Sequence, residues 1–127
     1  MKTGVLRKGA EVVVGQVEVA STLWARAIGL LRRGSLPSGH GMLLTGCGSI
    51  HTCFMRFSLD LIFFDTDWTV VKVVRDVKPW RVVSGGRRAK RVLEVQAGWL
   101  AGSDVGEGDH LTLVEAPSRG QTVSRRD

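Results

Sequence analysis

The residues that could do chemistry are concentrated between His51 and Asp65. Asp60 is the unusual one, because all the remaining residues from Leu59 to Phe64 are apolar. A strand with this pattern is covered on both faces, and a carboxylate inside it loses its hydration unless a cation or several hydrogen-bond donors replace the water. We therefore expect Asp60 to be buried, and to be held by Arg56, His51 or backbone N–H groups at the edge of a pocket.

A second carboxylate, Glu94, lies in the apolar run Val92–Val95 and could reach the same region from a neighbouring strand. Paired carboxylates serve general acid–base catalysis, but they are also held by arginine to close a core.

Two functions stay open. The first is a binding or interaction module for a small molecule or a protein, and the second is a small enzyme that uses Asp60, Glu94 or His51 as acid or base. We favour the first, because no reaction apparatus is complete, and we expect its pocket to be bordered by His51, Met55, Arg56, Asp60, Trp80 and Glu94.

Metal and cysteine chemistry have weaker support. Cys47, His51 and Cys53 form a C-x-x-x-H-x-C pattern, which matches none of the usual zinc spacings. No oxyanion hole or third orienting group accompanies a cysteine nucleophile paired with His51. We expect free thiols of a reducing compartment, no metal and no cofactor.

The net charge of +6 makes an acidic partner worth considering, but most of the excess is dispersed. The one compact cluster, residues 87–91, contains Arg87, Arg88, Lys90 and Arg91 and lies beside two glycines. We expect weak, salt-sensitive contacts with nucleic acid there and no specific recognition.

No apolar run approaches the ~20 residues of a membrane span, and the N-terminus does not read as a secretory signal. The expectation is a soluble cytoplasmic protein that has no membrane partner.

The elements that must position these residues are mostly strands. Residues 12–19 alternate with a period of two, residues 59–64 and 68–77 form apolar runs joined by the turn Asp65–Asp67, and shorter runs follow at 91–95 and 110–115. Residues 22–33 instead segregate leucines from arginines at the helical period. The pattern predicts an α+β, mostly β fold: a compact antiparallel sandwich or distorted barrel with one amphipathic helix at 22–33. We expect an N-terminal arm (1–11), one globular domain (12–116) and a flexible basic tail (117–127).

Several short motifs are distributed along the chain: Gly29-Leu30, Leu36-Pro37, Gly41-Met42-Leu43, His51-Thr52, Met55-Arg56-Phe57, Leu59-Asp60, Phe64-Asp65, Pro79, Val92-Leu93-Glu94, Ala97-Gly98 and Gly108-Asp109. Taken together, these motifs resemble those of the domain-of-unknown-function family 192, also known as uncharacterised protein family 0127. The resemblance covers roughly residues 12–115 and implies a compact β-rich fold without an established activity. Cys53 stands where that family usually carries a bulky apolar residue, which implies a packing role for it.

Overall fold

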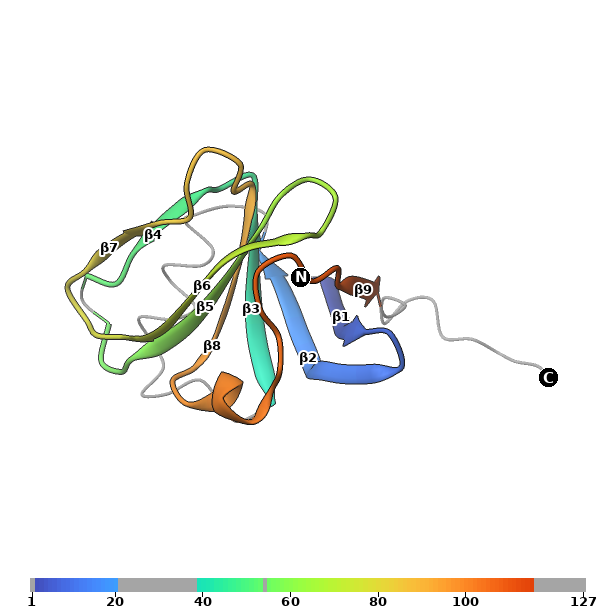
Figure 1. Cartoon of the computed structure of the whole chain (residues 1–127). Helices are drawn as coiled ribbons and strands as arrows, with labels where there is room; N and C mark the ends of the chain where they lie inside the picture. Colours follow the sequence, from blue (N-terminus) through green and yellow to red (C-terminus); the bar gives the residue numbers. More distant parts are fainter. Residues whose placement is uncertain (1, 21–38, 54, 116–127) are drawn as a thin grey trace.

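The computed structural model describes residues 2–20, 39–53 and 55–115 (Figure 1). Within these ranges nine strands and one short 3-10 helix follow each other along the chain. The strands are β1 (Lys2–Lys8), β2 (Glu11–Ala20), β3 (His40–Thr45), β4 (Ser49–His51), β5 (Leu59–Phe64), β6 (Val70–Val77), β7 (Val82–Ser84), β8 (Arg91–Gln96) and β9 (Thr112–Glu115), and the 3-10 helix η1 spans Trp99–Gly102. None of the described segments forms a helix long and apolar enough to cross a membrane.

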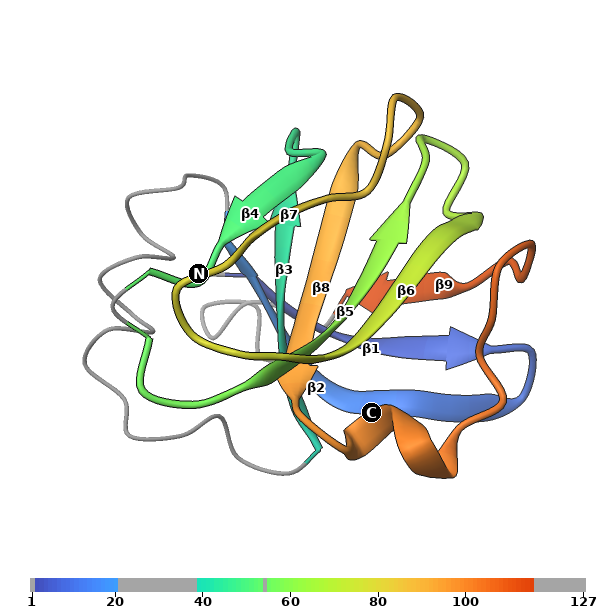
Figure 2. The ribbon, with the colours of Figure 1, turned by 60° about the vertical axis from the view of Figure 1, so that its left-hand side comes forward.

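Seven strands form one twisted sheet in the order β6-β5-β8-β3-β2-β1-β9, and β4 and β7 pair separately. Figure 2 shows that β1 and β9 run across the direction of β3 and β8, as expected for a strongly twisted sheet. All neighbours in the large sheet are antiparallel except β2 and β3, which are parallel. A parallel pair needs a long connection, and residues 21–39 provide it.

Strand β5, which lies between β6 and β8 in the sheet, is buried along its whole length, as its composition predicted. Its side chains alternate between two cores, because successive residues of a strand point to opposite faces. Ile62 and Phe64 enter one core with Leu43, Leu93 and Val95, which we call the first face of the sheet. Leu59, Leu61 and Phe63 enter the other core with Met42, Leu44 and Val92, on the second face.

The predominance of strands is confirmed, and two finer expectations need correction. The sheet is not closed into a barrel: a single bridge between Thr69 and His110 brings β6 close to the segment before β9, without continuous pairing. The sheet is also not purely antiparallel, because of the β2–β3 pair. The predicted amphipathic helix at 22–33 lies outside the described residues and stays a prediction.

Residues 2–8, part of the segment 1–11 that the sequence pattern assigns to an N-terminal arm, form strand β1 of the large sheet. Strand β1 pairs with β2 on one side and with β9 on the other, and Leu6 is buried in the core. The sequence conceals this strand because lysine, arginine, threonine and glycine surround its two apolar residues. Gly4 lies so close to Val114 of β9 that a side chain there would meet the Val114 carbonyl oxygen.

The β5–β6 hairpin is closed by Asp65, at the turn that the sequence predicted. Its Oδ1 accepts hydrogen bonds from the backbone N–H groups of Asp67 (2.8 Å) and Thr69 (3.0 Å). The Thr69 N–H, with further help from Asp67 and the nearby Arg88 and Arg91, lowers the pKa of the Asp65 carboxyl below its ordinary value of 3.8. A carboxylate favoured in this way stabilises the fold only while it is ionised.

Replacing Asp65 by asparagine should therefore reduce the pH dependence of stability. The asparagine Oδ1 can still accept both N–H groups, but the side chain no longer titrates. Because the folded pKa is depressed, the contribution of the carboxylate is present above 3.8 and is lost as pH falls through the folded value. We expect wild type to be the more stable protein at pH 7, and the difference in Tm to close in acid. A difference that stays constant down to pH 2 would contradict this assignment.

Candidate functional site

A β-bulge in β6 creates the local geometry around Asp60. Leu59 pairs with Val77 and Leu61 with Val74, so that two residues of β6, Arg75 and Asp76, lie opposite the single residue Asp60. Asp76 takes a left-handed conformation (φ 55°), which aspartate tolerates better than most residues. A bulge bends its strand and redirects side chains, and here it turns the Asp76 backbone N–H toward β5.

The Asp60 carboxylate is 1% exposed and is held by three backbone N–H groups. Oδ1 accepts from Asp76 (2.8 Å), and Oδ2 accepts from Gly98 (3.0 Å) and Leu100 (3.2 Å). Gly98 precedes the 3-10 helix in a left-handed conformation (φ 92°), which directs its N–H and that of Leu100 at the carboxylate. Burial of Asp60 and its retention by N–H groups are thus confirmed, while the expected Arg56 and His51 play no part in these three hydrogen bonds.

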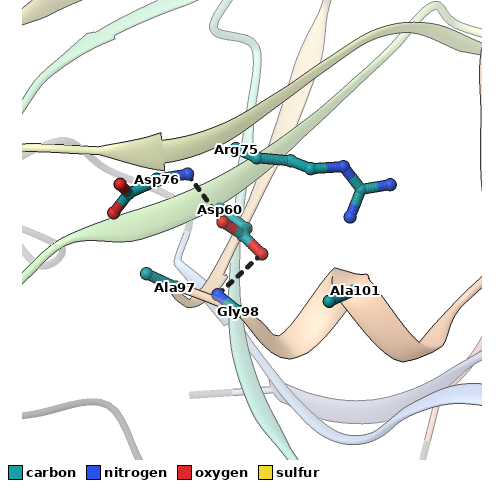
Figure 3. A pocket seen from close by; sticks show the side chains of 6 residues that line it. All are labelled: Asp60, Arg75, Asp76, Ala97, Gly98 and Ala101. Carbon is teal, nitrogen blue, oxygen red and sulfur yellow. Dashed lines mark hydrogen bonds between the residues drawn. The ribbon is translucent and has the colours of Figure 1, made fainter.

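Asp60 lies at one wall of a pocket of about 300 Å³ (Figure 3). The other lining residues are Arg75 and Asp76 of the bulge and Ala97, Gly98 and Ala101 of the segment at η1. Figure 3 shows the Arg75 side chain extending away from Asp60, on the side of Ala101, and the Asp76 carboxylate pointing away from Asp60 in the opposite direction. Asp76 forms an ion pair with Lys78 (2.9 Å), outside the pocket lining. The pocket therefore combines a buried carboxylate, an exposed guanidinium and a wall of small residues.

Glu94 does not join Asp60, although the two strands are neighbours. Asp60 pairs with Val95, and Glu94 pairs with Leu61. Residues directly opposite in an antiparallel pair share a face, and successive residues alternate. Asp60 is therefore on the first face of the sheet, whereas Glu94, fully buried, is on the second face.

The other residues proposed from the sequence do not line the pocket, and two of them, Met55 and Trp80, contact Thr52. His51 is exposed in β4, Arg56 is exposed in the turn before β5, and Met55 is buried in the second core. The Met55 N–H (3.1 Å) and the Trp80 N–H (3.0 Å) both donate to the Thr52 carbonyl. Of the six residues, Asp60 alone lines the 300 Å³ pocket.

Thr52 and Arg75 are the residues that sequence reasoning missed. The Thr52 side chain is fully buried, and its Oγ1 donates to the Lys78 carbonyl (2.7 Å) and accepts from the Arg81 N–H (2.9 Å). It thereby joins the turn after β4 to the segment before β7. The signal for Arg75 was the pair of adjacent polar residues 75 and 76, which interrupts a valine-rich strand.

The cysteines show no arrangement for metal binding. Within the described segments, no group of three or more His, Cys, Asp or Glu side chains could hold a metal ion. Cys47 and Cys53 are free thiols, both partly buried, and the Cys47 Sγ donates to the Ser49 carbonyl (2.6 Å). The prediction that the purified protein carries no zinc is left to elemental analysis.

Fold and pocket together define a small, mostly β domain in which a buried carboxylate borders a pocket. The chain belongs to the DUF192 family, described as "Uncharacterized ACR", whose model matches residues 5–113. It is 34% identical over 106 residues to a UPF0127 protein of Pyrococcus abyssi, covering 79% of this chain and 87% of the relative. A UPF0127 protein of Pyrococcus horikoshii is 35% identical over 83 residues, covering 63% of this chain and 71% of the relative.

Two crystal structures share the fold. One is a protein from Sinorhizobium meliloti proposed to be a transcription regulator, with a TM-score of 0.72 and 24% identity over 88% of this chain and 92% of the other. The second is a protein of unknown function from Novosphingobium aromaticivorans, with a TM-score of 0.69 and 21% identity over 88% of this chain and 84% of the other. At these identities the likeness concerns the fold alone.

Proposed function

We propose that the protein is a non-catalytic binding module, and that the pocket at Asp60 takes a small organic anion that also carries a hydroxyl or ammonium group. The observation that supports this most is that the buried Asp60 and the exposed Arg75 line the same pocket. A volume of about 300 Å³ is at the lower end of the range for small-molecule sites. The ligand should therefore be no larger than a small metabolite.

The hydrogen-bonding capacity of Asp60 favours a ligand that donates. An ionised carboxylate has about four acceptor sites. Three N–H groups already donate to Asp60, two of them to Oδ2 and one to Oδ1. Oδ1 can therefore accept one further hydrogen bond, and a hydroxyl or ammonium group would supply it.

Arg75 favours an anionic group on the same ligand. A guanidinium carries five N–H donors in a fixed plane and binds a carboxylate or phosphate through two parallel hydrogen bonds. Arg75 is exposed, so that it is accessible to a ligand from solution. Ala97, Gly98 and Ala101 leave room for a short hydrocarbon part between the two polar ends.

The alternative of acid–base catalysis has less support. A general acid and base act together only when both reach the reacting group within hydrogen-bond distance. Asp60 and Glu94 are on opposite faces of the sheet, and His51 belongs to the separate β4–β7 pair. Binding without catalysis is therefore the function that we infer.

A thermal-shift and calorimetric screen with small hydroxy acids and amino acids tests the proposal. A compound present at a hundred times its Kd should stabilise the protein by about 2.7 kcal/mol. Arg75→Gln should weaken that compound at least about tenfold, because the charge-assisted pair is lost. Analogues without the acid group, or without the donor group, should bind more weakly to wild type.

The matched control is Arg87→Gln, another exposed arginine, which does not line the pocket. It should bind the same compound as wild type does. Equal binding by wild type and Arg75→Gln would overturn the proposed site, and the absence of any stabilising compound in the screen would overturn the proposed ligand class.

A further inference from the structure

The segment from Trp80 to Val82 exposes apolar surface that the pocket does not use. Trp80 is 59% exposed and Val82 is 78% exposed, the largest values among the exposed large apolar residues of the described chain. Exposed apolar side chains that form a contiguous patch mark interaction sites, whereas single ones are common on protein surfaces, so the closeness of these two residues in the chain matters. Tryptophan is also the residue type most enriched among those that dominate binding energy at protein interfaces.

The backbone of Trp80 and Arg81 is constrained by hydrogen bonds to the buried Thr52. Trp80 takes a left-handed conformation (φ 67°), which is unusual for a bulky residue and persists only where the surroundings impose it. The buried Thr52 imposes it here, because its carbonyl accepts the Trp80 N–H and its Oγ1 accepts the Arg81 N–H. A surface that is already ordered loses little conformational entropy when a partner binds.

Strand β7 offers a backbone edge beside these side chains. In the β4–β7 pair, the Arg81 carbonyl accepts from Thr52 and the Gly85 N–H donates to Gly48, each at 2.8 Å. Because hydrogen-bonding direction alternates along a strand, the N–H and C=O groups of Val82 and Ser84 point away from β4. Lys72 Nζ donates to the Ser84 carbonyl (2.9 Å), which agrees with that direction. No described strand pairs with this outer edge of β7.

The charges around the edge define the partner. Lys72 stands at one end of β7, and Lys78 and Arg81 stand at the other, where Asp76 is the acid that pairs with Lys78. A second copy of this chain would bring the same cations against them, and its net charge of +6 opposes self-association. An acidic partner is attracted instead.

We propose that the β7 edge, comprising Trp80, Arg81, Val82 and Ser84, docks an extended acidic segment of another protein by adding a strand to the β4–β7 pair. Backbone hydrogen bonds to Val82 give such a segment its register. Its apolar side chains cover Trp80 and Val82, and its carboxylates lie near Lys72, Lys78 and Arg81. A peptide suits this edge better than a single-stranded nucleic acid, because nucleic acid uses stacking and phosphate contacts and leaves backbone amides and an aliphatic side chain unused. Figure 1 shows β7 on the opposite side of the molecule from β9, which carries a comparable exposed valine.

The probe is a short acetylated and amidated peptide in which valine and glutamate alternate, labelled for fluorescence anisotropy. We expect saturable binding to the full chain, with slower amide hydrogen exchange at Val82 and Ser84. Trp80→Ala and Val82→Glu should each weaken binding at least about tenfold. The same weakening should follow when the peptide valines are N-methylated, which removes their N–H donors, or when lysine replaces glutamate.

The matched control is Val114→Glu, since Val114 is a half-exposed valine on the edge strand β9. It should bind the peptide as wild type does, and circular dichroism should show that all three variants are folded. The proposal is overturned if the peptide does not bind by about 1 mM, or if Val82→Glu binds as well as Val114→Glu does. It is also overturned if an oligothymidine of similar length binds more tightly than the peptide.

Discussion

Replacing Asp60 by alanine should lower the free energy of unfolding by about 4 kcal/mol, since each buried donor left without an acceptor costs about 1–3 kcal/mol. Three backbone N–H groups, those of Asp76, Gly98 and Leu100, lose their acceptor at once. The full sum is not expected, because water in the pocket can reach the first two of these groups. Urea denaturation at neutral pH measures the change.

Asparagine at position 60 should give an intermediate loss, about 2 kcal/mol. Its amide oxygen can replace Oδ2 and accept from Gly98 and Leu100, but its NH₂ group then faces the Asp76 N–H, and the two donors repel each other. The control is Asp67→Ala, because that side chain is exposed in the β5–β6 turn, and a change within about 0.5 kcal/mol is expected. If Asp60→Ala costs less than about 1 kcal/mol, the carboxylate is not the structural centre of the site.

Thr52→Val should cost about 3 kcal/mol, because valine keeps the shape of threonine and removes the hydroxyl group. The Lys78 carbonyl then loses its donor and the Arg81 N–H loses its acceptor, each worth about 1–3 kcal/mol in a buried site. Thr52→Ser keeps the hydroxyl group and should retain most of the stability. Equal losses for valine and serine would show that the methyl group, and not the hydroxyl group, stabilises this region.

The same substitution should loosen the segment before β7. Valine keeps the backbone carbonyl that accepts from the Trp80 N–H, but it removes the Oγ1 that donates to the Lys78 carbonyl and accepts from the Arg81 N–H. These two lost contacts lie on either side of Trp80, whose left-handed conformation they help to hold. Thr52→Val should therefore speed amide hydrogen exchange at Trp80 and Arg81 more than in β5. Uniform acceleration throughout the sheet would indicate global destabilisation alone.

The sequence was sufficient to find Asp60 but not its partners. A carboxylate within six buried residues of β5 is conspicuous in composition, so that its burial could be predicted. Its partners are backbone N–H groups, which every residue except proline possesses, and no side-chain pattern announces them. Arg56, His51 and backbone N–H groups therefore all stayed open as partners on the sequence alone, and the structure shows that the Arg56 and His51 side chains are exposed.

The role of Arg75 depends on one additional residue in β6. In a regular antiparallel pair a single residue of β6 would oppose Asp60. The side chains of β6 would then alternate between the two faces of the sheet along the whole strand. The bulge places both Arg75 and Asp76 there. Valines precede and follow these two residues, and period-two reasoning reads the run as an ordinary strand. Strand β1 could not be predicted for another reason: it is buried by its pairing with β2 and β9, and its own residues are mostly polar.

The pairing of β1 with β9 has a consequence for synthesis of the chain. Gly4–Arg7 pairs with Thr112–Glu115, so β1 leaves the ribosome long before its partner β9 has been synthesised. Until then β1 has only β2 beside it, and an isolated two-stranded hairpin is at best marginally stable in water. Contacts so distant in sequence slow folding, because the loop between them must be closed before the contact is made. Truncation before residue 112 should therefore yield a nascent chain with an open sheet edge, the kind of species that chaperones bind and that aggregates when they do not.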